Sequence, residues 1–264
     1  MVAGCGSKSI NYPLLVFKNL SQQNLPLPRD PRIIYRGLPV AMINLGGTTA
    51  VQFVLTGMFQ KSLRAVTSDD RVVAMAGSFL GGLASGVPCA LWELTMIQQQ
   101  RFGGSLVGTP LAILRTHGPA GLATGMTMTL GRESLFTLSM LGLTPTIQDE
   151  LVRRSGLASD AALAAGALTG AIFAATLTHP MDTIKTCLQG DVAGLKYKSN
   201  AQTYALLIHE HGSFTALFKG LNWRIALIAT TFFLVNRIKE QIAPVLFPSK
   251  MAKAPSASSK PKQT

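Results

Sequence analysis

The chain has 264 residues, of which 47% are hydrophobic and only 14% are charged, and its mean hydropathy is +0.31. This composition is too apolar for an ordinary soluble domain and predicts an all-α protein embedded in a membrane. The formal net charge of +12 does not call for a nucleic-acid partner, because basic connections that face anionic lipid head groups account for it.

Apolar segments follow one another along the whole chain. The first, residues 1–12, contains Lys8 and is weak by hydropathy, so it is predicted only as a truncated span that the repeat described below requires. A bilayer is crossed by about 20 helical residues. Five further segments approach that length, at residues 37–58, 74–96, 122–143, 161–179 and 221–236. The tail at 249–264 is rich in Lys, Ser, Pro and Ala, and is predicted to be disordered.

A polar pattern occurs at the ends of alternate apolar segments. It consists, in whole or in part, of Pro, an acid two residues later, a base at five and Gln at nine. The three copies are Pro13, Lys18 and Gln22; Leu91, Glu93 and Gln100; and Pro180, Asp182, Lys185 and Gln189. After each copy a glycine opens the next apolar segment, at Gly37, Gly125 and Gly220. The unit is therefore helix, polar connection, helix, and it occurs three times.

This pattern resembles that of the mitochondrial carrier family, whose members carry Pro-x-(Asp/Glu)-x-x-(Lys/Arg)-x-x-x-Gln at the end of each odd helix. The resemblance covers roughly residues 3 to 243. It implies six transmembrane helices in three tandem repeats with pseudo-threefold symmetry, the first helix being truncated. The repeats would occupy residues 1–66, 67–155 and 156–248, followed by the basic tail at 249–264. The incomplete first and second copies indicate a divergent member.

Charge predicts how the spans are oriented. The connections at 18–36, 101–117 and 190–219 are together more positive than those at 61–71 and 149–160. They are expected to face the matrix, with both termini toward the intermembrane space, in a multi-pass protein of the mitochondrial inner membrane. Membrane lipids, cardiolipin among them, are expected partners.

In the family, the acid of one repeat pairs with the base of the next and closes a gate on the matrix side. Carried over to this chain, the resemblance implies that Glu93 pairs with Lys185 and Asp182 with Lys18. The kinks that Pro13 and Pro180 would introduce bring these ends toward the bundle axis.

The third gate pair would be Leu15 with Met96, and both of its charges are missing. Losing both charges leaves an apolar contact, whereas losing one would leave a lone charge in a poorly solvated ring. Gln22, Gln100 and Gln189 are all present and are expected to brace the ring by hydrogen bonds. The positions of the opposite gate carry almost no charge complementarity: Leu55, Thr56, Leu143, Thr144, Ile238 and Lys239.

Charged residues at membrane depth mark the candidate substrate site. Arg132 lies seven residues after Gly125, where carriers present a central substrate contact, and an Arg followed by an acid such as Glu133 resembles carriers of amino acids. Lys8 resembles the cavity lysine of nucleotide-type carriers. The corresponding or neighbouring positions of the other repeats are Asn44, Leu227 and Arg224.

A substrate carboxylate would meet Arg132 and a substrate amine would meet Glu133. Alternatively, these two residues neutralise each other or other groups. Small residues at Gly-x-x-x-Gly spacing, such as Gly77 with Gly81 and Gly82 with Gly86, predict close helix packing. The short stretch between Pro13 and Gly37 is expected to leave no room for the family's surface helix.

Other chemistry is scarce. The three cysteines lack Cys-x-x-Cys spacing, and His209 and His211 in a polar connection are better explained as solvated side chains than as metal ligands. No phosphate-binding loop or nucleophile elbow is present in the sequence. We therefore expect no enzyme, no cofactor, no metal and no nucleic-acid partner.

Two functions remain open. One is a mitochondrial carrier that moves a small carboxylate-bearing metabolite, amino acids included, across the inner membrane by alternating access. The other is a carrier-derived structural subunit of a larger inner-membrane protein complex, which the degenerate gates and the short first repeat would favour.

Overall fold

The computed structural model describes residues 2–143, 147, 150, 152–154, 159–231 and 234, and within these residues every regular element is a helix. The predicted tail at 249–264 and the end of the last predicted span lie outside them. The elements are α1 Val2–Gln22, α2 Pro31–Ile34, α3 Leu38–Leu63, α4 Asp70–Phe102, α5 Gly108–Leu122, α6 Met126–Thr137, the π-helical η1 Leu138–Leu143, α8 Ser159–Gly190, α9 Asn200–His211 and the 3-10 helix η2 Phe214–Phe218. Residues 221–231 are also helical.

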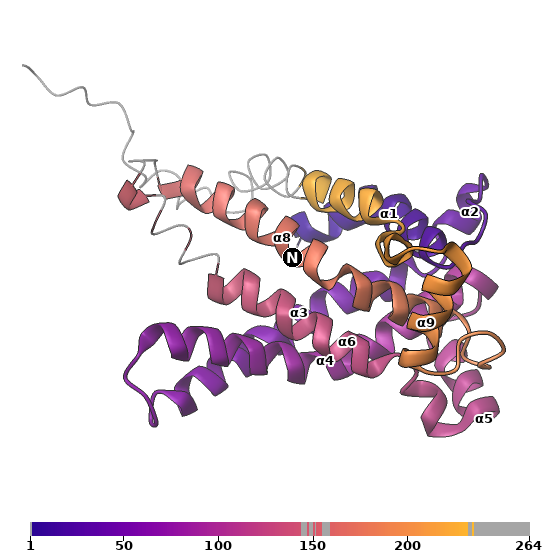
Figure 1. Cartoon of the computed structure of the whole chain (residues 1–264), viewed down its shortest axis with the longest axis horizontal. Helices are drawn as coiled ribbons and strands as arrows, with labels where there is room; N and C mark the ends of the chain where they lie inside the picture. The colour runs from indigo at the N-terminus through magenta and orange to yellow at the C-terminus, as the bar shows by residue number, and fades with distance from the viewer. Residues whose placement is uncertain are drawn as a thin grey trace, which may run out of the picture.

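The short helices gather at one end of the molecule. In Figure 1, α2, α5 and α9 lie at that end, and the turn that joins α3 to α4 lies at the opposite end. Each short helix follows a copy of the polar pattern, so the three copies reach the same end of the helix bundle.

Three glycines turn the chain from this end into the next long helix. Gly37 and Gly125 immediately precede α3 and α6, and Gly220 precedes the helix at 221–231. Their φ angles are 81°, 73° and 83°, in the left-handed region that glycine adopts without the steric strain of a Cβ. The glycines that follow the three copies of the polar pattern thus mark three equivalent turns.

The glycines of α4 allow its neighbours to approach closely on two sides. A Cβ added at Gly81 would lie 2.0 Å from Oγ1 of Thr56 on α3, and one added at Gly82 would lie 2.6 Å from the backbone oxygen of Glu133 on α6. Gly86 also lies close to α6, where an added Cβ would be 3.0 Å from the Cα of Leu130. The predicted role of these glycines in packing is confirmed.

The first helix is longer than predicted. It continues beyond Tyr12, through Pro13 to Gln22, and its 21 residues span roughly 30 Å at 1.5 Å per residue. The helices α4 and α8 likewise continue through Pro88 and Pro180. Proline is tolerated inside membrane helices because neighbouring helices satisfy the backbone groups that it frees.

By length and composition, two helical stretches among the described residues are apolar enough to cross a membrane, Pro31–Leu63 and Asp70–Phe102. Polar side chains lower the hydropathy of α1, where Asn11, Lys18 and Asn19 are buried against other helices. Of the five clear spans expected from hydropathy, those at 37–58 and 74–96 fall within these two stretches.

The first connection does contain a helix, although a short one. The helix α2 has 4 residues, whereas α5 has 15 and α9 has 12. It starts at Pro31, and the Asp30 side chain accepts a hydrogen bond from the backbone N–H of Arg32. The short stretch thus has room for one helical turn, where we expected none.

The connection after α8 is ordered around Asp191. Its carboxylate accepts hydrogen bonds from the backbone N–H groups of Leu195, Lys196 and Tyr197 at 3.3, 2.7 and 2.9 Å. Partial burial works against ionisation, but these hydrogen bonds outweigh it and lower the pKa of Asp191. The turn leads the chain into α9.

Candidate functional site

Two buried ion pairs join the ends of the odd helices. Lys18 of α1 places its Nζ 2.5 Å from Oδ2 of Asp182 on α8, and Lys185 of α8 places its Nζ 3.0 Å from Oε2 of Glu93 on α4. Lys185 also lies 3.1 Å from Oδ1 of Asp182. All four side chains are at most 12% exposed. Both pairings are those that the family resemblance implies.

Arg132 of α6 extends this network to a fifth side chain. Its Nη2 lies 2.8 Å from Oε1 of Glu93 and 2.7 Å from Oε1 of Glu133, and its Nε lies 3.6 Å from Oδ1 of Asp182. Arg132 therefore bridges the expected substrate site and the expected gate. The alternative interpretation, in which Arg132 and Glu133 neutralise each other or other groups, describes the structure in this state.

Arg224 approaches the same network from the helix at 221–231. Its Nη1 lies 3.6 Å from Oδ2 of Asp182, and its Nη2 donates a hydrogen bond of 2.9 Å to Oγ1 of Thr178. Asp182 thus faces four cationic side chains, Lys18, Arg132, Lys185 and Arg224. Charges buried to this degree are tolerated only when each is paired and hydrogen-bonded, so the cluster holds together as a unit.

A cavity of about 310 Å³ opens directly onto this network. All six residues that the sequence assigns to the substrate site line it: Lys8, Asn44, Arg132, Glu133, Arg224 and Leu227. Lys8 makes no ion pair with any described residue, whereas the arginines are engaged by acids. Lys8 is therefore a cavity cation with no acidic partner among the described residues, and it lies in the same cavity as the ion network.

One wall of the cavity is a polar stripe on α3 that sequence reasoning found only in part. Asn44 was expected there, and the structure adds Thr48 and Gln52, one and two turns further along the helix. The Oγ1 of Thr48 donates to Oδ1 of Asn44 at 2.7 Å, and Gln52 donates to Thr137 of α6. Spacing of four and eight residues from Asn44 was the signal that could have identified both.

Comparisons with known proteins show the family to which the chain belongs. The family model described as mitochondrial carrier protein matches residues 158–249. The mitochondrial S-adenosylmethionine carrier protein of Xenopus tropicalis is 30% identical over 213 residues, which cover 77% of this chain and 78% of the relative. This chain belongs to the mitochondrial carrier family.

Two further relatives of this carrier are named for other substrates. A tricarboxylate transporter of Gibberella moniliformis is 28% identical over 83% of this chain and 78% of its own length. A mitochondrial arginine transporter of Arabidopsis thaliana is 25% identical over 74% of this chain and 68% of its own length. The resemblance inferred from the three motif copies is confirmed, and the relatives' named substrates differ in charge and size.

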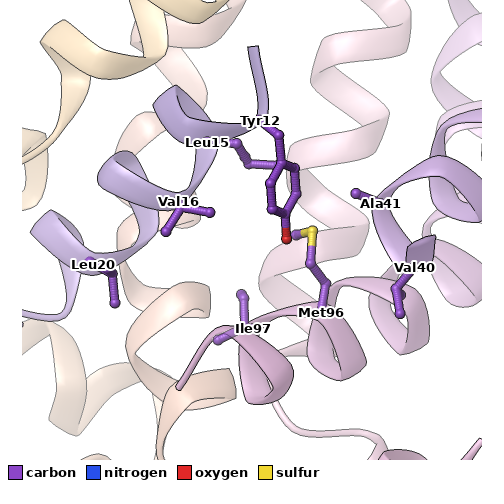
Figure 2. Packing of buried hydrophobic residues seen from close by; sticks show 8 residues of the cluster. All are labelled: Tyr12, Leu15, Val16, Leu20, Val40, Ala41, Met96 and Ile97. Atoms are coloured by element: carbon purple, nitrogen blue, oxygen red, sulfur yellow. The ribbon is translucent and has the colours of Figure 1, made fainter. Parts of the chain in front are cut away.

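In this carrier the two residues expected at the third gate position are both apolar and buried. Leu15 is 8% exposed and Met96 is 4% exposed, and both belong to a buried cluster of α1, α3 and α4. Figure 2 shows the ring of Tyr12 extending from α1 toward Met96, with Leu15 on the α1 side of that ring. Direct contact between Leu15 and Met96 stays a prediction.

The three motif glutamines are buried but serve different contacts. Gln22 donates to Oδ2 of Asp182 at 3.0 Å and so touches the charged ring. Gln100 donates to the hydroxyl of Tyr12 at 3.0 Å, and Gln189 donates to the backbone oxygen of Ala90 at 3.2 Å. Gln22 alone braces the ring charges in the way expected. Gln100 and Gln189 instead fasten α4 to its neighbours.

Half of the residues expected at the opposite gate lie beyond the described residues. Thr144, Ile238 and Lys239 lie outside them. Thr56, which is 4% exposed, packs against Gly81 of α4. It therefore contributes to helix packing rather than to the cavity.

Proposed function

We propose that this carrier moves a small carboxylate-bearing metabolite, amino acids included, across the mitochondrial inner membrane by alternating access. The observation that carries the proposal is the position of Arg132, which is shared by the cavity and by the ion network at its floor. A substrate bound to Arg132 acts on the gate through the same guanidinium.

The uncommitted cation attracts an anionic group first. Lys8 lines the cavity and forms no ion pair with any described residue, so it is free to attract a carboxylate that enters. The carboxylate then competes with Glu93 and Glu133 for Arg132. A substrate amine takes the place of the guanidinium at Glu133, which favours amino acids over simple carboxylates.

This competition couples binding to opening. When Arg132 turns to the substrate, Glu93 loses its 2.8 Å contact and keeps only Lys185. The closed network is weakened by the same contact that holds the substrate. A ligand shifts a conformational equilibrium by its difference in affinity for the two states, and this exchange of partners supplies such a difference.

The architecture belongs to the same proposal. It comprises three repeats at residues 1–66, 67–155 and 156–248, six transmembrane helices, and α2, α5 and α9 on the matrix side with both termini toward the intermembrane space. The supporting observation is that these three short helices lie at one end of the molecule (Figure 1). Lipids such as cardiolipin would contact the basic connections at this end.

The alternative of a structural subunit gains no support from the relatives, because those named above are carriers or transporters. The cavity also retains all six residues that the transport hypothesis requires. Transport is therefore the function that the observations favour.

The test compares Arg132→Ala with wild type in liposomes that contain the purified protein. We expect Arg132→Ala to abolish uptake of labelled carboxylate-bearing metabolites while the protein remains folded. Arg64→Ala is the matched control, since its side chain is 70% exposed and lies in the connection between α3 and α4. Uptake by Arg132→Ala at the wild-type rate would remove Arg132 from the site.

A further inference from the structure

The seam between α1 and α4 is held differently from the two seams that involve α8. Ion pairs connect α8 to α1 through Lys18 and to α4 through Glu93. Between α1 and α4, the described residues form no ion pair and instead form a chain of hydrogen bonds between neutral groups. The chain runs from Asn19 through Gln100 to Tyr12.

The chain has a consistent direction. The Nδ2 of Asn19 donates to Oε1 of Gln100 at 2.8 Å, and the Nε2 of Gln100 donates to the hydroxyl of Tyr12 at 3.0 Å. The hydroxyl in turn donates to the backbone oxygen of Arg36 at 2.5 Å. Each of the three hydrogen bonds pairs a donor with an acceptor, so the orientations of the two side-chain amides and of the hydroxyl do not conflict. Asn19, Gln100 and Tyr12 are at most 4% exposed.

This chain of hydrogen bonds also fixes the start of α3. A Cβ added at Gly37 would lie 2.9 Å from the Tyr12 hydroxyl and 3.1 Å from the backbone oxygen of Met96. The turn at Gly37 therefore packs directly on the point where α1 and α4 meet. Figure 2 shows the surrounding cluster, with the Tyr12 hydroxyl end directed toward Met96.

We propose that Tyr12, Asn19 and Gln100 form a neutral lock that closes the matrix side between repeats 1 and 2, where the third gate ion pair is missing. This inference rests on the proposed function, in which that side opens and closes. The three hydrogen bonds join α1, α4 and the residue before Gly37, so separation of the seam breaks them together.

The lock differs from the ionic seams in its response to substrate. A carboxylate or an amine competes directly for Arg132, Glu93 and Glu133, but it has no charged partner to displace in the lock. The substrate therefore acts directly on the α4–α8 seam, where it competes with Glu93 for Arg132. The α1–α4 seam resists opening through its own hydrogen bonds. Tyr12 and Gln100 are in this sense positioning residues for the transport cycle.

The first test measures opening without any substrate. Cys89 is 3% exposed and lines the cavity, so it serves as a reporter once Cys5 and Cys187 are replaced by Ser. A membrane-impermeant maleimide is added to vesicles on the side where α2, α5 and α9 lie. Tyr12→Phe is expected to raise the labelling rate of Cys89 about 2- to 10-fold, the range for losing a buried hydrogen bond.

The matched control is Tyr35→Phe. Tyr35 stacks on Tyr12 with ring centroids 6.0 Å apart, but it is 41% exposed. Tyr35→Phe is expected to leave labelling at the wild-type rate. Equal labelling of Cys89 in Tyr12→Phe and wild type would overturn the lock, and so would an equal rise in the Tyr35→Phe control.

The second test asks whether the coupling runs through Gln100. Tyr12→Phe and Asn19→Ala are compared singly and together, by thermal unfolding and by Cys89 labelling. Their effects should be non-additive in the wild-type background and additive in a Gln100→Leu background, because Gln100 is the group that joins them. Coupling that persists in Gln100→Leu would overturn the lock.

These results are separable from the proposed function. A labelling response without uptake of any metabolite would support the lock and contradict transport. Uptake that Tyr12→Phe leaves unchanged in both maximal rate and half-saturating concentration, together with unchanged labelling, would support transport and overturn the lock.

Discussion

Glu93→Lys should destabilise this carrier more than the loss of a single ion pair would. Adding Lys185→Glu should recover only part of the lost stability. Glu93 lies 3.0 Å from Lys185 and 2.8 Å from Arg132, so Glu93→Lys places three cations together. At an effective dielectric constant of about 20, each of these contacts amounts to roughly 5 to 6 kcal/mol of attraction that becomes repulsion.

Desolvation reduces these figures. Breaking a buried ion pair by changing one partner typically lowers the free energy of unfolding by about 3 to 5 kcal/mol. We expect Glu93→Lys to reach that range. Adding Lys185→Glu restores attraction between positions 93 and 185. It does not restore the contact with Arg132, and it places a carboxylate beside Asp182, now 3.1 Å from the Lys185 ammonium.

The assay is thermal unfolding of the two single variants and the double variant in detergent, in a double-mutant cycle. The expected result is a favourable coupling with incomplete recovery of stability. Reversal of the exposed pair Arg64 and Asp70, with side chains 70% and 88% exposed, is the control and should change stability by less than about 1 kcal/mol. Strictly additive effects at Glu93 and Lys185 would mean that the two side chains are not partners and would refute the reasoning.

Three further predictions follow from the packing. Asp182→Asn should lower the free energy of unfolding by about 3 to 5 kcal/mol, because it leaves four cations facing a neutral amide. An unchanged melting temperature would contradict this. Leu15→Asp and Met96→Lys should each be harmful alone, and together they should show a favourable coupling of about 0.5 to 3 kcal/mol in a double-mutant cycle; additivity would mean that they do not meet. Gly81→Ala should destabilise by about 1 to 3 kcal/mol through overpacking, whereas Gly47→Ala, where an added Cβ has no neighbour within 4 Å, should not, and equal melting temperatures would contradict the close approach of α3 and α4.

The gate pairs could be predicted because the repeat supplies the register. Corresponding motif positions after Pro13, Leu91 and Pro180 place Lys18, Glu93 and the α8 charges near the ends of the odd helices. The resemblance to the mitochondrial carrier family then implied which of them meet. Most of the candidate substrate-site residues could be located by their offset from a turn glycine or from the motif proline, and the family resemblance supplied their expected role. Arg224 was included as a neighbour in the last helix.

Contacts between residues that do not occupy equivalent positions of the repeats could not be predicted in this way. The contact of Arg132 with Glu93 depends on the lateral register between α6 and α4, and neither hydropathy nor repeat spacing specifies that register. Tyr12 precedes the motif by one residue and carries no repeat signal. Its partner Gln100 was identified, but as a brace for the charged ring rather than for a neutral seam.

The helix α1 was underestimated for a similar reason. Its buried Asn11, Lys18 and Asn19 lower the hydropathy that marks a span, although their polar groups are satisfied by neighbouring helices. Only tertiary structure supplies those partners.

Uptake by the wild-type protein in liposomes is the decisive measurement of whether this carrier transports a carboxylate-bearing metabolite. Labelled amino acids and simple carboxylates are offered alongside the same compounds with the carboxylate converted to an amide, and the size of the purified species is measured in a mild-detergent native gel. We expect saturable uptake that the carboxylate-bearing compounds inhibit and their amides do not. Absence of saturable uptake for every carboxylate-bearing compound, with migration in a complex much larger than the 28.0 kDa monomer, would contradict it and favour the structural subunit.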